Sequence, residues 1–361
     1  MSTKFFDSLV DIANERGVLV EDVLAKVEIA MQVACKNSPS LPYKGTIKID
    51  YNLEKKTIKF YDYQYIVKEI DPEGPRGQIL VEEARLFKPS ARAGQVIKTR
   101  VDLKLFKRKS AAIFKQNLLN ELKSLERDEA FNFFQEKTGE IINARVCAIN
   151  DTFITFDLGK DVEATMGQKD MLPGENYTVD DIKKVYITRV EKTGRGPKVY
   201  ISRSSRDFVR KLFELNIPEV ANGQVEIMAV ARDPGNRSKV GVMSVNGDID
   251  PKGACVGAAG SRIKAINEVL NGEKIDIFVW KSNPVELIAE ALSPARCVSV
   301  IADENEKKAI AIVNDDQFSL AIGAKGQNAK LAVLATGWKI DIKKLSDAQA
   351  EGINFSYNIN M

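Results

Sequence analysis

The chain has 361 residues, of which 44% are hydrophobic and 29% are charged, a balance typical of globular domains. Its length predicts two to four domains, because a single core rarely grows beyond about 250–300 residues. The formal net charge is only +3, so any surface that binds nucleic acid has to be local. Histidine is absent, which excludes histidine bases, Ser-His-Asp sites and histidine-containing metal sites.

The four cysteines, Cys35, Cys147, Cys255 and Cys297, form no Cys-x-x-Cys pair and lie beside apolar residues. We therefore predict buried free thiols rather than a zinc ribbon or a thioredoxin-like motif. The N-terminus has no signal-like apolar run, and no stretch approaches the roughly 18 apolar residues of a membrane span. With reduced thiols, this pattern predicts a cytoplasmic protein. No catalytic constellation or phosphate-binding P-loop is found, and we expect no enzyme activity, cofactor or metal.

Residues 1–136 predict an N-terminal unit that mixes helices and strands. Apolar residues recur at helical spacing over Phe5–Ala13 and again over Val23–Ala34. A polar helix from about Phe106 to Glu136 closes the unit, and its length indicates a connector to the next domain. Between these helices, turn-rich segments separate the strand patterns Thr46–Tyr51, Thr57–Val67, Gln78–Phe87 and Gln95–Leu103.

Residues 137–204 change to short strands. Five strand patterns occupy about 65 residues, with a long connection between the third and the fourth, which is typical of an OB barrel of the S-one type. Another small barrel is the alternative. The strand patterns are Ile141–Ile149, Phe153–Leu158, Val162–Met166, Lys184–Val190 and Lys198–Ser202.

The barrel offers a few candidate RNA contacts. Phe153 and Phe156 alternate on one strand, so at most one of them faces outward to stack on a base. We take Phe153 as the candidate, and Arg145, Lys198 and Arg203 as candidate phosphate contacts.

The chain from residue 205 to 345 contains an internal repeat. Each copy predicts the order helix, strand, strand, helix–loop–helix, strand. The loop Gly257–Gly260 recurs 66 residues later as Gly323–Gly326, and Lys274–Ile277 recurs 65 residues later. Two landmarks at nearly one offset predict two tandem modules of the same fold.

A Gly-x-x-Gly turn between two short helices lets a backbone ligand approach closely, because glycine carries no Cβ. The turn also points helix N-terminal amides at phosphate oxygens, which is how KH modules clamp single-stranded RNA. We predict RNA contacts at the loops and at the start of the helices that follow. In the first copy these residues are Gly257, Ala258, Ala259, Gly260, Ser261, Arg262 and Lys264, and in the second they are Gly323, Ala324, Lys325, Gly326, Gln327, Asn328 and Lys330.

Residues 249–262 and 272–277 resemble the first KH module of the family of the bacterial transcription factor NusA, and residues 320–332 with 336–338 resemble its second. The N-terminal helix pair and the domain order are also similar, so the resemblance covers nearly the whole chain. It implies an α+β multidomain fold, with an α/β N-terminal unit and its long connector helix, a five-stranded OB barrel and two α-β-β-α-α-β KH modules. The expected domains are 1–136 (binding RNA polymerase), 137–204 (barrel), 205–282 (first KH), 283–345 (second KH) and 346–361 (flexible tail).

The resemblance also implies a function. We expect a monomeric transcription elongation factor, with no membrane contact, that binds RNA polymerase through its N-terminal domain and nascent single-stranded RNA through the barrel and KH modules. Together with other termination and antitermination factors it would modulate pausing, intrinsic termination and antitermination. The alternatives are a ribosome-associated RNA-binding factor and a component of an RNA-processing enzyme.

The sequence departs from the family pattern in two places. The first loop is Gly-Ala-Ala-Gly, whereas family members commonly carry a basic residue between the glycines. We therefore expect the second loop, which contains Lys325, to bind RNA more strongly. Nothing after Leu345 resembles the acidic C-terminal repeats of some members, so we expect a tail that is mobile or docks elsewhere, and no autoinhibition through such repeats.

Overall fold

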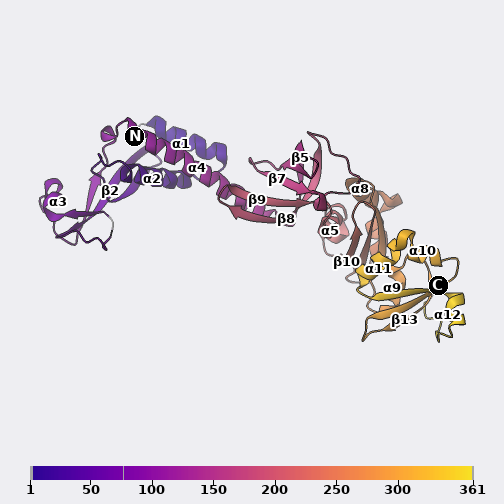
Figure 1. Ribbon diagram of the computed structural model, residues 1–361. Helices are drawn as coiled ribbons and strands as arrows, with labels where there is room; N and C mark the ends of the chain where they lie inside the picture. Colours follow the sequence, from indigo (N-terminus) through magenta and orange to yellow (C-terminus); the bar gives the residue numbers. More distant parts are fainter. Residues whose placement is uncertain (1–2, 76, 360–361) are drawn as a thin grey trace. The chain divides into compact units, whose positions relative to one another are not determined.

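The structure, a computed structural model, describes residues 3–75 and 77–359 (Figure 1). It separates into two compact units, which are described one at a time: the first is Met1–Phe133 with Lys192–Pro197, and the second is Phe134–Glu191 with Lys198–Met361. Within the described residues, no helix is long and apolar enough to cross a membrane.

The long helices of the first unit are α1 (Thr3–Arg16), α2 (Val20–Lys36) and α4 (Arg108–Glu136), of which α4 belongs to this unit as far as Phe133. Their apolar positions form one core with the inner face of a β-sheet. This core confirms the helical periodicity read from the sequence and includes Phe6, Leu9, Val23, Val27, Leu122, Ile47, Ile58 and Phe60.

The sheet of the first unit contains β1 (Thr46–Asn52), β2 (Thr57–Val67), β3 (Gln78–Leu80) and β4 (Val96–Arg100). Strand β2 is central, antiparallel to β1 and β4 and parallel to β3. The predicted strand Gln78–Phe87 is wrong beyond Leu80, because Val81–Phe87 forms helix α3. This segment is rich in helix-forming Glu, Ala, Arg and Leu, and it places Ala84 in a small core with Ile66 and Ile97.

Asp62 points from β2 into the interior of the first unit and is 1% exposed. Burial raises the pKa of its carboxyl from 3.8 to about 6, although hydrogen bonds from Gly45, Gln64 and Lys44 oppose the shift. Its contribution to stability is therefore greatest below about pH 4 and is lost as the pH rises through about 6.

Replacing Asp62 by asparagine is expected to stabilise the sheet at pH 7 by about 2 kcal/mol, because the amide keeps the shape and removes the buried charge. Hydrogen exchange of the β2 amides, followed at pH 5 and pH 7, measures this locally. After correction for the intrinsic exchange rate, the gain should be larger at pH 7. An equal gain at both pH values would contradict the assignment of the effect to ionisation.

The barrel of the second unit confirms the predicted strand pattern. Its sheet has the order β7-β6-β5-β8-β9 and forms a nearly closed five-stranded barrel. Phe156 is 0% exposed and lies in the interior, whereas Phe153 is 37% exposed, as strand alternation predicts. The strands are β5 (Ile141–Ile149), β6 (Phe153–Asp157), β7 (Glu163–Gly167), β8 (Ile182–Thr193) and β9 (Gly196–Ser202).

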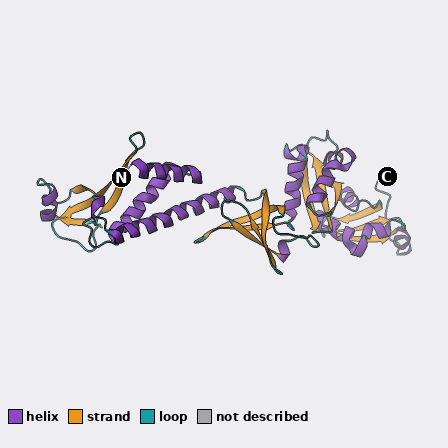
Figure 2. Cartoon of the chain, turned by 90° about the horizontal axis from the view of Figure 1, so that it is seen from above, coloured by secondary structure: helices purple, strands orange, loops and turns teal. Residues whose placement is uncertain are grey.

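The predicted repeat is confirmed: two consecutive modules have the order helix, strand, strand, helix, helix, strand that is expected of KH modules, and the first has one additional short helix, α6 (Pro218–Ala221). Figure 2 shows helices in purple and strands in orange. In each three-stranded sheet, the first two strands are antiparallel and the third is parallel to the second. The first module has α5 (Arg206–Asn216), α6 (Pro218–Ala221), β10 (Val225–Asp233), β11 (Arg237–Ser244), α7 (Pro251–Val256), α8 (Ser261–Val269) and β12 (Lys274–Val279). The second has α9 (Pro284–Ala291), β13 (Cys297–Asp303), β14 (Lys308–Val313), α10 (Phe318–Ile322), α11 (Gln327–Thr336) and β15 (Lys339–Lys344).

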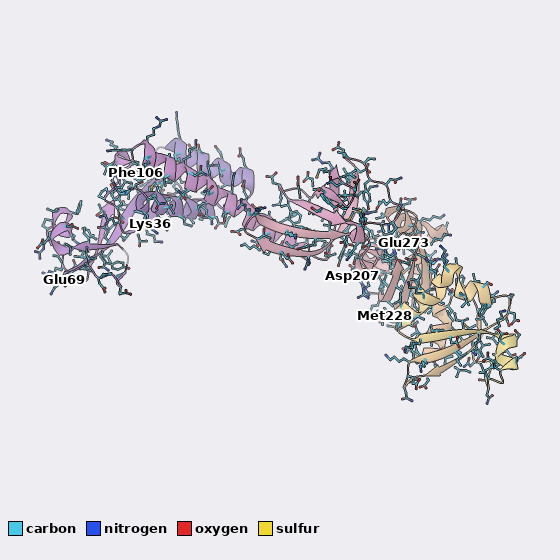
Figure 3. The ribbon with its side chains drawn as sticks, in the orientation of Figure 1. Lys36, Glu69, Phe106, Asp207, Met228 and Glu273 are labelled. Atoms are coloured by element: carbon cyan, nitrogen blue, oxygen red, sulfur yellow. The ribbon has the colours of Figure 1, made fainter. Side chains whose placement is uncertain are left out.

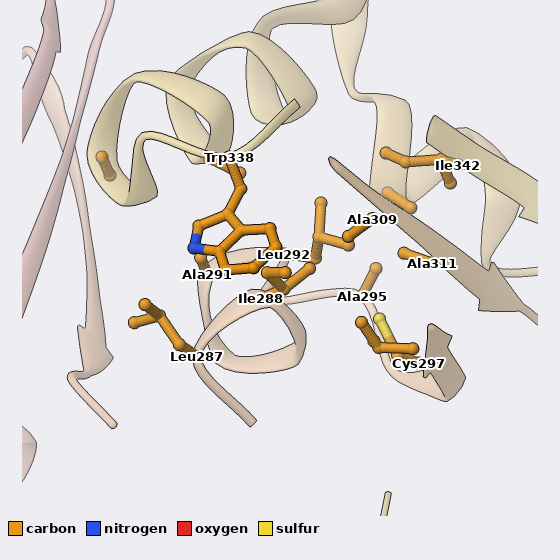
Figure 4. Close-up of a cluster of buried hydrophobic side chains, with 14 of the residues drawn as sticks. Leu287, Ile288, Ala291, Leu292, Ala295, Cys297, Ala309, Ala311, Trp338 and Ile342 are labelled. Atoms are coloured by element: carbon orange, nitrogen blue, oxygen red, sulfur yellow. The ribbon is translucent and has the colours of Figure 1, made fainter. Parts of the chain in front are cut away.

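The first KH module has a core of its own, and the core of the second module also includes residues of the first. Ala231 and Phe278 of the first module pack into the core of the second, where Trp338 lies close to Ile288 and Leu292 (Figure 4). Across the same junction, the buried Lys239 donates from Nζ to the carbonyl oxygen of Ser293 at 2.8 Å. A continuous core with a buried hydrogen bond fixes the two modules relative to each other.

The segment after β15, expected to be mobile or to dock elsewhere, is described as far as residue 359. Leu345–Ala350 forms helix α12. Farther along, Ser299 donates to the carbonyl oxygen of Ser356 at 2.7 Å, and Asn358 exchanges two hydrogen bonds with the backbone of Val300. Strand β13 lies at the edge of its sheet, so these contacts satisfy backbone groups that would otherwise face solvent.

The cysteines are free thiols, as predicted. Cys35, Cys255 and Cys297 are buried, and burial raises the pKa of each thiol to about 12. Cys147 differs from the prediction because it is only half-buried, with Sγ donating to the carbonyl oxygen of Thr155.

Candidate nucleic-acid interface

The two Gly-x-x-Gly loops have almost the same backbone conformation. The first glycine has φ 73° and ψ 174° at Gly257, and φ 75° and ψ 170° at Gly323. The last glycine is left-handed in both loops, with φ 74° at Gly260 and 76° at Gly326. Residues other than glycine rarely adopt these φ and ψ values. The turn therefore requires glycine at both positions, which explains the Gly-x-x-Gly pattern.

The first and the last glycine of a loop have different surroundings. A Cβ on Gly257 would lie 2.7 Å from Cγ of Arg262, and a Cβ on Gly323 would lie 2.8 Å from the backbone nitrogen of Asn328. A Cβ on Gly326 would meet nothing within 4 Å. The first glycine is therefore needed for close packing under the loop, whereas the last one leaves its outer surface open.

The residue before the last glycine is also left-handed, with φ 50° at Ala259 and φ 54° at Lys325. Such a conformation costs a non-glycine residue about 1 kcal/mol. Both side chains are exposed. The two loops therefore expose the equivalent position to solvent, as the methyl group of Ala259 in the first loop and as the ammonium group of Lys325 in the second.

Two residues that were predicted to contact RNA form hydrogen bonds beneath the loops. Asn328 is 4% exposed, and its Nδ2 donates to the carbonyl oxygens of Leu292 and Ala321, each at 3.0 Å. Its expected contact with RNA is thus corrected to a structural role, since its amide nitrogen faces the interior.

Arg262 occupies the matching position of the first module. Its Nη1 donates to Oε2 of Glu219 at 2.7 Å and to the carbonyl oxygen of Ala254 at 2.6 Å. The guanidinium is held by these two acceptors beneath the loop, with 31% of the side chain exposed, and its contact with phosphate stays a prediction.

The other predicted positions lie on the surface around the loops. Gln327 is half-buried, and its Nε2 donates to Oδ2 of Asp233 in the first module at 2.7 Å, which ties the start of α11 to β10. Apart from the half-buried glycines, the remaining candidates are exposed: Ala258, Ala259, Ser261, Lys264, Ala324, Lys325 and Lys330.

Arg203 was expected to bind phosphate, and the structure corrects this. Its side chain is 2% exposed and binds Glu175 through two hydrogen bonds of 2.7 Å. It also donates to the carbonyl oxygens of Lys184 in the barrel and Val269 in α8 of the first KH module. Arg203 therefore joins the barrel to the first KH module, and its burial keeps the guanidinium away from RNA.

The first KH module contains a second buried ion pair. The sequence analysis did not predict it. Arg232 is paired with Glu273, and their side chains are 2% and 0% exposed (Glu273 is labelled in Figure 3). Glu273 accepts two further hydrogen bonds, from Ser238 and from the amide of Gly235. The partners are 41 residues apart in sequence, so no local pattern could have revealed the pair.

The outer surface of the barrel keeps three of its candidates: Phe153, Arg145 and Lys198. Lys198 is exposed, with its Nζ 4.9 Å from the ring centre of Tyr200. Phe153 is partly exposed, in a position to stack on a base. Arg145 is exposed but lies 3.0 Å from Asp157 and 3.8 Å from Asp180. Hydrogen bonds from the amide of Gly159 and from Arg145 hold the pKa of Asp157 below its ordinary value, so a phosphate at Arg145 has to compete with two carboxylates.

Known proteins share this architecture. The chain matches the NusA N-terminal domain over residues 4–128, the NusA-like first KH domain over 203–280 and the NusA-like second KH domain over 284–350. It is 39% identical over 353 residues to the transcription termination/antitermination protein NusA of Bacillus subtilis strain 168, covering 98% of this chain and 94% of that protein. The NusA protein of Halalkalibacterium halodurans is 39% identical, with coverages of 98% and 91%. That of Thermus thermophilus is 34% identical, with coverages of 95% and 90%.

Proposed function

This chain belongs to the NusA family of transcription termination/antitermination proteins, and from that membership we propose how its parts act during transcription. The N-terminal domain docks on RNA polymerase in the cytoplasm, and the protein acts as a monomer. The barrel and the KH modules hold the nascent single-stranded RNA. Through this pair of contacts, and together with other termination and antitermination factors, the protein modulates pausing, intrinsic termination and antitermination.

The observation that supports the proposed RNA binding is the pair of similar Gly-x-x-Gly loops on two KH modules that are packed against each other. Both loops have the same backbone conformation, and a Cβ on the last glycine would meet nothing within 4 Å at Gly326 and only side-chain atoms, at 3.8 Å or more, at Gly260. The shared core and the hydrogen bond from Gln327 to Asp233 keep the two modules in fixed orientation. Once a single RNA strand has bound one loop, its binding to the second loop is intramolecular. The effective concentration of RNA at the second loop is then high, which favours binding to both loops by one strand.

The two loops offer a direct comparison of the same position with and without charge. Changing Ala259 to lysine is expected to strengthen RNA binding by the first module several-fold, since Lys325 already occupies the same backbone conformation in the second. Changing Lys325 to alanine should weaken the second module by a similar factor. Titration of single-stranded RNA at several salt concentrations measures both, and each lysine should change the slope of log K against log salt by about 0.7. If neither variant changes that slope, the side chain at this position does not contact phosphate.

The polymerase contact is tested by co-purification. A tagged full-length chain expressed in its own host should retain RNA polymerase subunits after nuclease treatment. Recovery of ribosomal proteins without polymerase would instead favour a ribosome-associated RNA-binding factor. Degradation of labelled RNA by the purified chain in the presence of Mg²⁺ would favour an RNA-processing enzyme.

A further inference from the structure

The outer face of the sheet in the first unit carries a row of tyrosines. Tyr61, Tyr63 and Tyr65 alternate along β2 with the buried residues Asp62 and Gln64, so their side chains share one face. Tyr65 is 45% exposed, and the other two are partly exposed. The core of the unit lies on the opposite face, where α1 and α2 pack against Ile47, Ile58 and Phe60.

Cations flank this row on both neighbouring strands. In the register of the sheet, Tyr61 lies between Lys48 of β1 and Arg100 of β4, and Tyr63 lies opposite Lys98. The ammonium nitrogen of Lys98 is 3.9 Å from the ring centre of Tyr61 and 5.6 Å from that of Tyr63.

The face carries more positive than negative charge. Lys48 is paired with Glu28 of α2. Lys59, Lys98 and Arg100 form no ion pair with any residue between 3 and 75 or 77 and 359. Asp50 lies opposite Lys59 in the β1–β2 register. A hydrogen bond with Tyr63 and the negative charge of Asp50 raise the pKa of Lys98. Tyrosine is a good strand former, so a single tyrosine on the exposed face of a strand needs no further explanation. Strand propensity alone does not explain three tyrosines in a row beside cations that form no ion pair with the residues that the structure describes.

We propose that this face, formed by Tyr61, Tyr63, Tyr65, Lys59, Lys98 and Arg100, binds single-stranded RNA. Aromatic rings on a flat sheet stack on unpaired bases, and cations beside them neutralise the phosphates that link those bases. The charge complementarity favours a polyanion over an apolar protein surface. The site is distinct from the KH loops and adds an RNA contact to the first unit, beyond the function proposed above.

Photo-crosslinking of the full-length chain tests the proposal. The probe is a single-stranded oligouridine that carries 5-iodouridine, and crosslinked peptides are identified by mass spectrometry. Crosslinks are expected at the β2 tyrosines in addition to those in the KH modules. The double variant Lys98→Gln/Arg100→Gln should lower the β2 yield about tenfold, because two charge-assisted contacts are lost. The matched control Lys88→Gln/Arg92→Gln removes the same charge from exposed positions in the loop after α3 and should leave the yield unchanged.

A second pair of variants separates stacking from hydrogen bonding. Tyr61→Phe should retain the crosslinks to the rest of the row, whereas Tyr65→Ala should lower the β2 yield. Crosslinks confined to the KH modules and barrel would overturn this inference and leave the proposed function standing, whereas a chain without any crosslink would contradict both. Loss of affinity for purified RNA polymerase in Lys98→Gln/Arg100→Gln, without any RNA crosslink at β2, would show that the face binds protein and would also overturn the inference.

Discussion

Replacing Gly326 by aspartate is expected to weaken binding of single-stranded RNA by about tenfold or more, while the second KH module stays folded. The carboxylate would lie on the outer surface of the loop, where the phosphate is expected, and would repel it. Folding should be preserved because a Cβ at this position meets nothing within 4 Å. Aspartate also tolerates the left-handed conformation, φ 76°, better than most residues do.

The matched control is Gly326→Asn, which has the same shape without the charge. Its loss of RNA affinity should be clearly smaller, and both variants should melt within a few degrees of the original chain. Gly323 is the less informative position, because a Cβ there would collide with the backbone of Asn328 and disturb the start of α11. Equal RNA affinity in folded Gly326→Asp and in the original chain would remove the loop from the binding site.

Replacing Arg203 by methionine is expected to destabilise the second unit by about 3 kcal/mol, because it leaves the buried carboxylate of Glu175 without its main partner. Glu175 is 4% exposed, and Lys183, at 3.6 Å, can replace only part of the interaction. The substitution also removes the hydrogen bond to Val269, which joins the barrel to the first KH module. Urea unfolding followed by the fluorescence of Trp280 and Trp338 measures the loss.

The double variant Arg203→Met/Glu175→Gln serves as the control, since it removes the stranded charge together with its partner. It should recover part of the stability. The salt dependence of RNA binding should stay unchanged in the folded Arg203→Met chain, because Arg203 does not reach a phosphate. A shallower salt dependence with unchanged stability would restore the original phosphate-binding assignment of Arg203.

Periodic patterns predicted most of the fold. The helices at the N-terminus, the five strands of the barrel and the repeated KH order follow from hydrophobic periodicity and from matched glycines, and each appears at nearly the expected bounds. The error at Val81–Phe87 arose because the apolar strand signal of Ile79, Leu80 and Val81 runs directly into a segment that is too short for its period to identify a helix. The packing of Ala84 against Ile66 and Ile97, which are not adjacent in sequence, decides the outcome.

The candidate site was predicted less completely than the fold. A basic or polar side chain beside a loop can point outward, toward a ligand, or inward, toward acceptors within the protein, and the sequence does not distinguish the two. Arg203, Arg262 and Asn328 all have the right chemistry for phosphate, yet each faces protein acceptors. Those acceptors, Glu175 and Glu219 among them, are distant in the chain, so local spacing carries no signal for them. By contrast, the glycines and the exposed Lys325 were predictable, since the turn itself dictates their geometry.

The central claim is that the KH loops hold nascent RNA while the chain acts on transcription, and a single-round transcription assay tests it most directly. The template carries an intrinsic terminator, and purified RNA polymerase is supplied with the original chain, Gly326→Asp or Gly326→Asn at equal concentration. The account predicts that the original chain changes the terminated fraction, that Gly326→Asn retains most of this effect and that Gly326→Asp loses most of it. An unchanged effect with Gly326→Asp, or no effect with the original chain, would contradict it.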